Sequence, residues 1–320
     1  GLVGALSPYV PEAWSVRKQF QLDALLCAKA YWTKVETLSG KATGYGQIGR
    51  YIVLPSEYEA DKATGRIAGA ARFWQGATWR VLPNIPLIDP KSAPYGIVHE
   101  TLSARIDPRM AAQALAGAIE KLGGDIVEKC LVQDIKNGTV ITSDCTLTAD
   151  HIVIAAGVDG LPLLEPFLGG KAVRGVKGQA AKLDIALPAG TPLINGEGIY
   201  IIPHAAGHVS VGSTSETSWD DPFATDALLD EVLEKACAIC PALRGANVLE
   251  RWAGLRPRAP KPEPMLGQLD TGVYVATGGF KTGLAVAPRV AEALADMIEG
   301  KTPDMPLDFS PQHHFSPRKK

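Results

Sequence analysis

Apolar residues recur every three or four positions in several stretches of the chain, which is the period of an amphipathic helix. The longest stretch begins at Val16 and is followed by Ser39-Gly40, a stop signal. Another begins after Asp107-Pro108, which places an N-cap acid before a proline at the first helical position. The pattern predicts helices over Val16–Leu38, Ala60–Ala71, Met110–Leu122, Asp226–Cys240 and Gly283–Ile298.

Short apolar runs bounded by glycine or proline separate these helices and predict strands. The region Gly44–Leu54 has the pattern of a hairpin, whereas Val81–Tyr95 contains four prolines and is expected to be a loop or an edge strand. Helices interleaved with strands predict a mixed α/β and α+β fold. The other predicted strands are Asp125–Gln133, Gly138–Thr142, His151–Gly157, Gln179–Leu183, Gly198–Pro203, His208–Gly212 and Gly272–Ala276.

Length and composition narrow the class of protein. The 320 residues favour two domains, and 46% apolar with 21% charged residues is typical of a globular chain. The formal charge of -2 provides no basic surplus for nucleic acid. No apolar run approaches the ~20 residues that span a bilayer, so no transmembrane segment is expected. Five scattered cysteines and no signal peptide favour a reducing, cytoplasmic location.

Two short motifs are interpreted as structural. Gly44–Gly49 matches G-x-G-x-x-G, but that fingerprint needs a strand before it and a helix after it, and here the order is reversed. We therefore expect a turn. Cys237 and Cys240 form a C-x-x-C pair with no partner motif, at the end of a predicted helix. Two buried thiols are the better interpretation, and no metal site is predicted.

Three C-terminal segments carry residues suited to ligand binding. Arg256, in W-A-G-L-R-P, is placed to bind a carboxylate through two hydrogen bonds, or to form an internal salt bridge. Tyr200, in G-I-Y-I-I-P, is either a rim residue of the core or part of a site. The segment Val273–Gly283 has the pattern of a strand, a glycine-rich loop and the start of a helix. This arrangement can bind a planar ligand with partial negative charge, or it can serve only to pack the helix on the strand.

Taken together and in this order, the three segments resemble the D-amino-acid oxidase superfamily of FAD-dependent oxidoreductases, and most closely its glycine oxidase and D-amino-acid dehydrogenase branches. Ala149–Gly157 is similar to the family segment that passes beside the flavin. The resemblance implies a discontinuous, Rossmann-like FAD domain over residues 1–40, 95–171 and 249–320. It implies an antiparallel-sheet substrate domain over residues 41–94 and 172–248.

The resemblance also implies roles for single residues. Arg256 binds the substrate carboxylate and Tyr200 helps to close the site. Lys281 stands where glycine oxidases have arginine, so it is expected to stabilise charge on the reduced flavin and not to grip a carboxylate. The residues expected to contact FAD are Val127, Ala155, Ala156, Gly157, Gly278, Gly279, Phe280, Lys281 and Thr282.

The activity implied by the resemblance is FAD-dependent oxidation of the C–N bond of an amino acid or related amine, with oxygen or a quinone-linked acceptor. Two alternatives stay open, namely a truncated, non-catalytic remnant of this fold and the flavoprotein domain of a tRNA-modifying enzyme. The printed residues do not begin with the family's strand, G-x-G-x-x-G and helix, so the FAD domain is expected to be incomplete at the N-terminus. We expect weak FAD binding by these residues alone, and self-association into a homo-oligomer is left open.

Overall fold

The computed structural model describes residues 1–169 and 173–315. It has two compact units, of which unit 1 contains Gly1–Gly123 and Lys177–Gly254 and unit 2 contains Gly124–Val176 and Leu255–Lys320. Strands β11 (Arg174–Asp184) and β15 (Asn247–Arg258) each run from one unit into the other. These units are defined by contacts alone, so the division into an FAD domain and a substrate domain stays a prediction.

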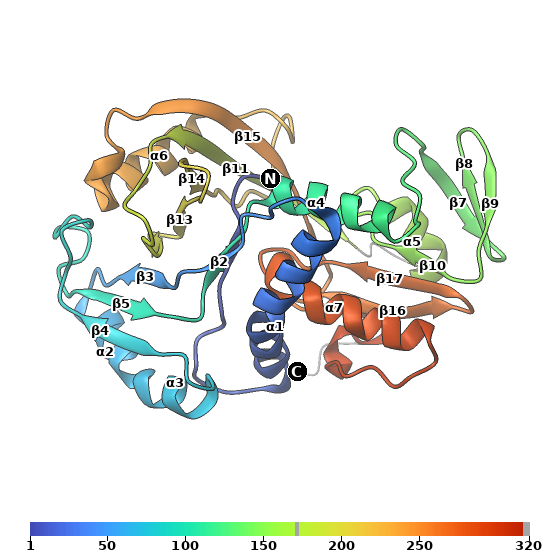
Figure 1. Ribbon diagram of the computed structural model, residues 1–320, viewed down its shortest axis with the longest axis horizontal. Helices are drawn as coiled ribbons and strands as arrows, with labels where there is room; N and C mark the ends of the chain where they lie inside the picture. The colour runs from blue at the N-terminus through green and yellow to red at the C-terminus, as the bar shows by residue number, and fades with distance from the viewer. Residues whose placement is uncertain (170–172, 316–320) are drawn as a thin grey trace. The chain divides into compact units, whose positions relative to one another are not determined.

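Unit 1 is built on an eight-stranded sheet with the order β15-β11-β14-β13-β12-β3-β5-β4 (Figure 1). From β11 to β4 every neighbouring pair is antiparallel except β12 and β3, which run parallel. The expected antiparallel sheet is therefore confirmed. Its remaining strands are β3 (Arg50–Val53), β4 (Trp79–Leu82), β5 (Ile97–Glu100), β12 (Leu193–Gly196), β13 (Ile199–Pro203) and β14 (Val209–Gly212).

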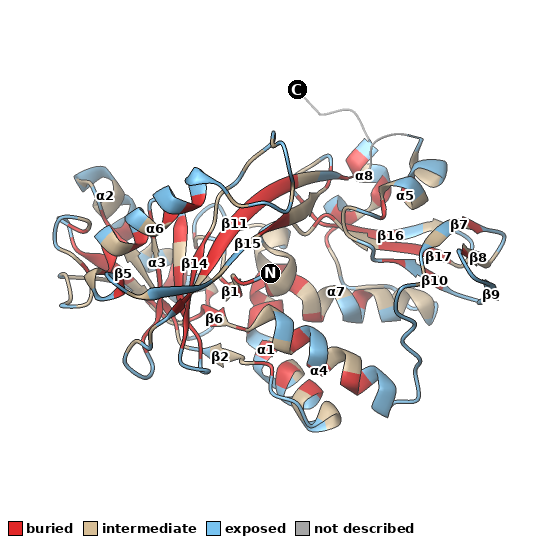
Figure 2. Cartoon of the chain, turned by 90° about the horizontal axis from the view of Figure 1, so that it is seen from above, coloured by how far each residue is buried: buried red, intermediate tan, exposed pale blue. Residues whose placement is uncertain are grey.

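The core of unit 1 lies between this sheet and helix α6 (Ala227–Ile239), which packs on β13 and β14. Ile201 and Val211 of the sheet and Leu229 of the helix are fully buried in it. Figure 2 shows the middle of β11 as buried, and β14 is buried along its whole length. Consecutive residues of these two strands are buried, so both faces of this part of the sheet are covered.

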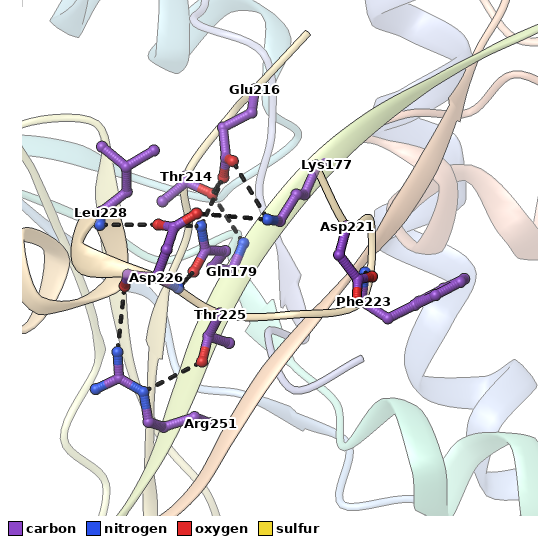
Figure 3. A network of polar contacts seen from close by, with 10 residues as sticks. All are labelled: Lys177, Gln179, Thr214, Glu216, Asp221, Phe223, Thr225, Asp226, Leu228 and Arg251. Carbon is purple, nitrogen blue, oxygen red and sulfur yellow. Dashed lines mark hydrogen bonds and ion pairs between the residues drawn. The ribbon is translucent and has the colours of Figure 1, made fainter. Parts of the chain in front are cut away.

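A polar network fixes the start of α6 to β11 (Figure 3). Buried Lys177 places its Nζ 3.7 Å from a carboxylate oxygen of Glu216 and 3.5 Å from one of Asp226. The Gln179 amide donates to Glu216 Oε1 at 3.1 Å and to Asp226 Oδ1 at 2.8 Å, and accepts from the Asp226 backbone N–H at 2.9 Å. Asp226 also caps α6, so one carboxylate joins helix and sheet.

The helices α1 (Val16–Ser39) and α4 (Pro108–Lys121) pack against each other in unit 1, and the predicted end of α1 at Gly40 and cap of α4 at Asp107 are confirmed. Ser15 accepts from the Lys18 backbone N–H at the start of α1, and Gly40 ends it in the left-handed region at φ 69°. The predicted helix at Ala60–Ala71 is two helices beside β4. They are α2 (Glu57–Gly65) and α3 (Ile67–Phe73).

The predicted hairpin at Gly44–Leu54 is wrong. Its two strands pair with other segments, because β2 (Gly46–Gln47) lies beside β6 (Ala104–Arg105), while β3 lies between β5 and β12. A third strand, β1 (Ala5–Leu6), pairs with β6. Gly49 has φ 73°, and a Cβ there would lie 2.4 Å from the Glu100 carbonyl oxygen, so the G-x-G-x-x-G match reflects close strand packing after a helix.

Unit 2 contains a sheet with the order β10-β17-β16, in which β10 (Ile152–Ile154) and β17 (Val273–Thr277) are parallel. The predicted strand Asp125–Gln133 is wrong over most of its length, since regular pairing begins at Val132. The preceding segment is irregular and contains a turn in which Lys129 has φ 58°. The other elements are β7 (Val132–Lys136), β8 (Thr139–Thr142), β9 (Thr146–Thr148), α5 (Leu161–Leu168), β16 (Met265–Asp270), α7 (Gly283–Ile298) and α8 (Pro311–Phe315).

Among the described residues, no helix has both the length and the hydropathy that a membrane span requires.

Candidate functional site

The parallel pair β10 and β17 brings two predicted cofactor-binding segments to one edge of a sheet. Ile152 lies opposite Val273 and Ile154 opposite Val275. Because both strands run the same way, Ala155–Gly157 and Gly278–Thr282 leave the sheet at the same edge. In open α/β sheets, ligands bind outside the carboxyl ends of the strands.

The loop after β17 is held in one shape by backbone hydrogen bonds, one to β15 and one within the loop. Phe280 donates its N–H to the Pro257 carbonyl at 3.1 Å, and Thr282 donates to the Gly279 carbonyl at 2.8 Å. A Cβ on Gly279 would lie 2.7 Å from Gly283 Cα, so a side chain there would displace the backbone. Phe280 itself has φ 44°, an uncommon value for a residue other than glycine. The loop is therefore a fixed support for the start of α7.

The start of α7 is open to a ligand. Thr282 is its N-cap residue but makes no side-chain capping hydrogen bond. Among the described residues, and apart from the adjoining backbone, no heavy atom lies within 4 Å of the position that a Cβ would take on Gly283 or on Gly157. Ala155 and Ala156 are exposed. Small residues and uncapped helical N–H groups favour a planar ligand with partial negative charge.

Two cationic side chains, Arg258 and Lys281, lie beside Phe280, and a third, Arg256, lies near enough to Lys281 to affect its charge. Arg256 and Arg258 are two residues apart on β15 and so share a face of the strand. The guanidinium carbon of Arg258 lies 5.2 Å from the Phe280 ring centroid, and Lys281 Nζ lies 5.6 Å from it. Partial loss of water around the ammonium group, together with the charges of Arg256 and Arg258, lowers the pKa of Lys281. Positive charge concentrated in this way favours an anion.

Tyr200 belongs to unit 1 and has a different neighbourhood. Its hydroxyl accepts a hydrogen bond from Arg50 at 2.9 Å, and Arg50 Nε donates to Glu100 at 3.1 Å. Glu100 is fully buried and also accepts from the backbone N–H groups of Leu102 at 2.8 Å and Ser103 at 3.0 Å. Sequence reasoning missed Arg50 and Glu100, although a charge within each of two apolar strands was a visible signal.

Val127, Cys237 and Cys240 are the other residues that were interpreted from the sequence. Val127 is 68% exposed in the irregular segment before β7, and its contact with a cofactor stays a prediction. Cys237 and Cys240 are free thiols, and burial raises the pKa of both. This agrees with the structural interpretation of the C-x-x-C pair, since reactive cysteines have a lowered pKa.

Comparison with known families gives one match over most of the chain. The family model described as FAD dependent oxidoreductase (DAO) matches residues 3–297. A glycine oxidase of Pseudomonas putida is 32% identical over 176 residues, which are 54% of this chain and 48% of that protein. The bifunctional protein ThiO/ThiG of a Nostoc species is 28% identical over 309 residues, covering 90% of this chain and 45% of that protein. The chain thus spans about half the length of these relatives.

Solved structures share the fold. Glycine oxidase from Geobacillus kaustophilus superposes with a TM-score of 0.85 at 23% identity, covering 98% of this chain and 88% of that one. Iminodiacetate oxidase from a Chelativorans species superposes with a TM-score of 0.82 at 24% identity, covering 97% of this chain and 88% of that one. The mixed α/β architecture is therefore confirmed by structural comparison as well as by the sheets themselves.

Proposed function

Because the chain belongs to the DAO family of FAD-dependent oxidoreductases, we propose that the protein oxidises the C–N bond of an amino acid or a related amine with FAD as its cofactor. The observation that carries this proposal is the edge of the β10–β17 sheet in unit 2. There Ala155–Gly157 and Gly278–Thr282 directly follow two parallel strands, and Lys281 of the second segment lies near Arg256 and Arg258.

The residues at this edge fit a flavin. FAD, when bound, takes up the hydride equivalent from the carbon that carries the nitrogen. Open space at Gly157 and Gly283 lets a flat ring system approach the backbone. The uncapped N–H groups at the start of α7 offer hydrogen bonds to its electron-rich edge. Lys281 supplies a positive charge beside the loop, which stabilises negative charge that builds up during the reaction.

Arg256 is the residue proposed to bind the substrate carboxylate. It directly precedes Pro257 on β15, which restricts its backbone, and its planar guanidinium can hold both carboxylate oxygens. The resulting contact orients the Cα–H bond for transfer. The relatives named for oxidation of glycine and of iminodiacetate support an α-amino acid as substrate and oxygen as acceptor.

The test compares Arg256→Ala and Arg256→Lys with the matched control Arg251→Ala. Arg251 lies on the same strand and pairs with Asp230, so its loss removes an arginine away from the proposed site. A charge-assisted pair contributes ~2–4 kcal/mol, which at about 1.4 kcal/mol per tenfold raises KM by roughly 30- to 1,000-fold. Arg256→Lys should recover only part of the loss.

The measurement is steady-state kinetics with a panel of glycine, sarcosine and D-amino acids, at saturating FAD and with the flavin spectrum recorded for each variant. The proposal expects an unchanged spectrum and a raised KM only in the two Arg256 variants. A KM that stays the same in Arg256→Ala, or rises equally in Arg251→Ala, contradicts the assignment.

A further inference from the structure

The turn between β13 and β14 places two histidines side by side in unit 1. His204 donates its backbone N–H to the His208 carbonyl at 2.8 Å, and Gly207 donates to the His204 carbonyl at 3.1 Å. These bonds close the turn, so the backbone holds the two histidines next to each other. The two imidazole rings stack with centroids 4.7 Å apart and planes 22° apart.

Both histidines are buried, and His204 lacks the hydrogen bonds that a buried imidazole normally makes. Their exposed fractions are 6% for His204 and 8% for His208. Neither ring nitrogen of His204 has a hydrogen-bond partner of normal geometry within the described part of the chain, although the Leu2 backbone lies near the ring. A buried polar group without a partner is costly, and a bound ion or water is a common reason for one.

A carboxylate faces the same two rings. Asp107 uses Oδ1 to cap α4, accepting from the backbone N–H groups of Arg109 at 2.9 Å and Met110 at 3.1 Å. Its other oxygen, Oδ2, lies 4.0 Å from His208 Nε2. One donor atom from each of Asp107, His204 and His208 lies within 4.8 Å of the other two.

The charges around this cluster restrict the kind of ion that fits. Arg105 and Lys182 lie close enough to lower the pKa values of His204 and His208 respectively, after burial, which has the larger effect. The positive charges of Arg105 and Lys182 oppose a bound cation, and the negative charge of Asp107 offsets part of that repulsion. Two neutral imidazoles with one carboxylate favour a borderline transition metal over Mg²⁺ or Ca²⁺, which require oxygen ligands.

We propose that Asp107, His204 and His208 bind a divalent transition-metal ion, with Zn²⁺ as the first choice, and that the ion links the β13–β14 turn to the start of α4. Zinc binds nitrogen and carboxylate oxygen at about 2.0–2.2 Å, so tetrahedral donors lie about 3.3 Å apart. Rotation of the side chains brings the three donor atoms to this separation. A water molecule completes the coordination, and the site acts as a clamp within unit 1.

The experiment uses the full chain, freed of metal with a chelator and titrated with Zn²⁺ by calorimetry at neutral pH. One ion per chain is expected, with a rise in unfolding temperature and no response to Mg²⁺. His204→Gln, His208→Gln and Asp107→Asn should each weaken binding at least about tenfold, since even outer-sphere losses have effects of this size. Asparagine keeps the cap of α4, so the Asp107 variant tests the ligand separately from the fold.

His151→Gln is the matched control, because His151 is exposed and lies outside the cluster. X-ray absorption on the zinc-loaded wild-type protein provides a second measurement that needs no variant, and it should show two imidazole ligands. The proposal is overturned if zinc does not bind, if the cluster variants bind it as tightly as His151→Gln, or if the spectrum lacks imidazole scattering. None of these readouts uses turnover, so they are independent of the proposed oxidation.

Discussion

Replacing Glu100 with glutamine removes the carboxylate that faces Arg50 inside unit 1. Glu100 is 0% exposed and Arg50 is 6% exposed, so water cannot take over as the partner of the guanidinium. Breaking a buried ion pair from one side destabilises a protein by about 3–5 kcal/mol, because it leaves a buried charge uncompensated. Typical domains unfold at a cost of about 5–15 kcal/mol, so Glu100→Gln should remove a large share of the stability.

A double-mutant cycle separates this electrostatic effect from general damage to the core. Arg50→Met alone leaves the Glu100 carboxylate buried with only its neutral donors, whereas the double variant Arg50→Met with Glu100→Gln leaves no net charge in the pair. The double variant should therefore be less destabilised than the sum of the single variants, by about 2 kcal/mol. Arg50 also donates to Tyr200 at 2.9 Å, so both Arg50 variants should alter the environment of that tyrosine.

The assay is urea unfolding at neutral pH, followed by tryptophan fluorescence, on the wild-type chain and the three variants. Asp230→Asn serves as the control, because its ion pair with Arg251 at 2.6 Å is exposed and should contribute less than about 1 kcal/mol. Strictly additive single effects, or a loss in Glu100→Gln no larger than in Asp230→Asn, would refute the reasoning.

Three further changes test other parts of the structure. Gly279→Ala should lower FAD affinity at least about tenfold, since the new Cβ would lie 2.7 Å from the backbone at the start of α7. The flavin content of each variant after gel filtration measures this affinity. Lys177→Met should destabilise the chain by about 3 kcal/mol in urea unfolding, because two carboxylates lose their buried partner. Burial lowers the pKa of His314 below its ordinary value of 6.5. As the pH falls below 6.5, the unfolded chain therefore binds a proton before the folded chain does, and stability is lost until the pH reaches the folded-state pKa. His314→Gln should flatten the dependence of stability on pH in this range.

Each of these has a control or a contradicting outcome. Gly65→Ala places a Cβ in open space and should leave FAD binding unchanged. If Gly279→Ala also binds FAD normally, the loop does not support the cofactor. A Lys177→Met variant as stable as the wild type would mean that the carboxylates are satisfied without the lysine. An acid profile unaltered by His314→Gln would place the titrating group elsewhere.

The helices were predictable because their signals are local. The ends of α1, α4, α6 and α7 lie within two residues of the predicted ends, since Ser15, Asp107 and Asp226 each cap the helix that follows them. Strand pairing was not predictable in the same way. The two strands of Gly44–Leu54 pair with segments about 50 or more residues away, and no local pattern names those partners.

The residues of the candidate sites show the same difference between local signals, which the sequence displays, and long-range contacts, which it does not. Arg256 and the loop Gly278–Thr282 were identifiable because each lies in a continuous segment with a recognisable order of residues. The pairing of Arg50 with Glu100 and the grouping of Asp107 with the two histidines of the β13–β14 turn depend on tertiary structure. The sequence contains His204 and His208 in an H-x-x-x-H spacing. Only the tertiary structure shows that Asp107, at the start of α4, provides a third donor atom beside them.

The central claim is that the protein oxidises an amine with FAD, and anaerobic reduction of the bound flavin tests it most directly. Adding glycine, sarcosine or a D-amino acid to the FAD-loaded protein without oxygen should abolish the yellow absorption band and release one equivalent of keto acid for each flavin reduced. Readmission of an electron acceptor should restore the band. A band that persists with every amine, while dithionite still removes it, would contradict the claim.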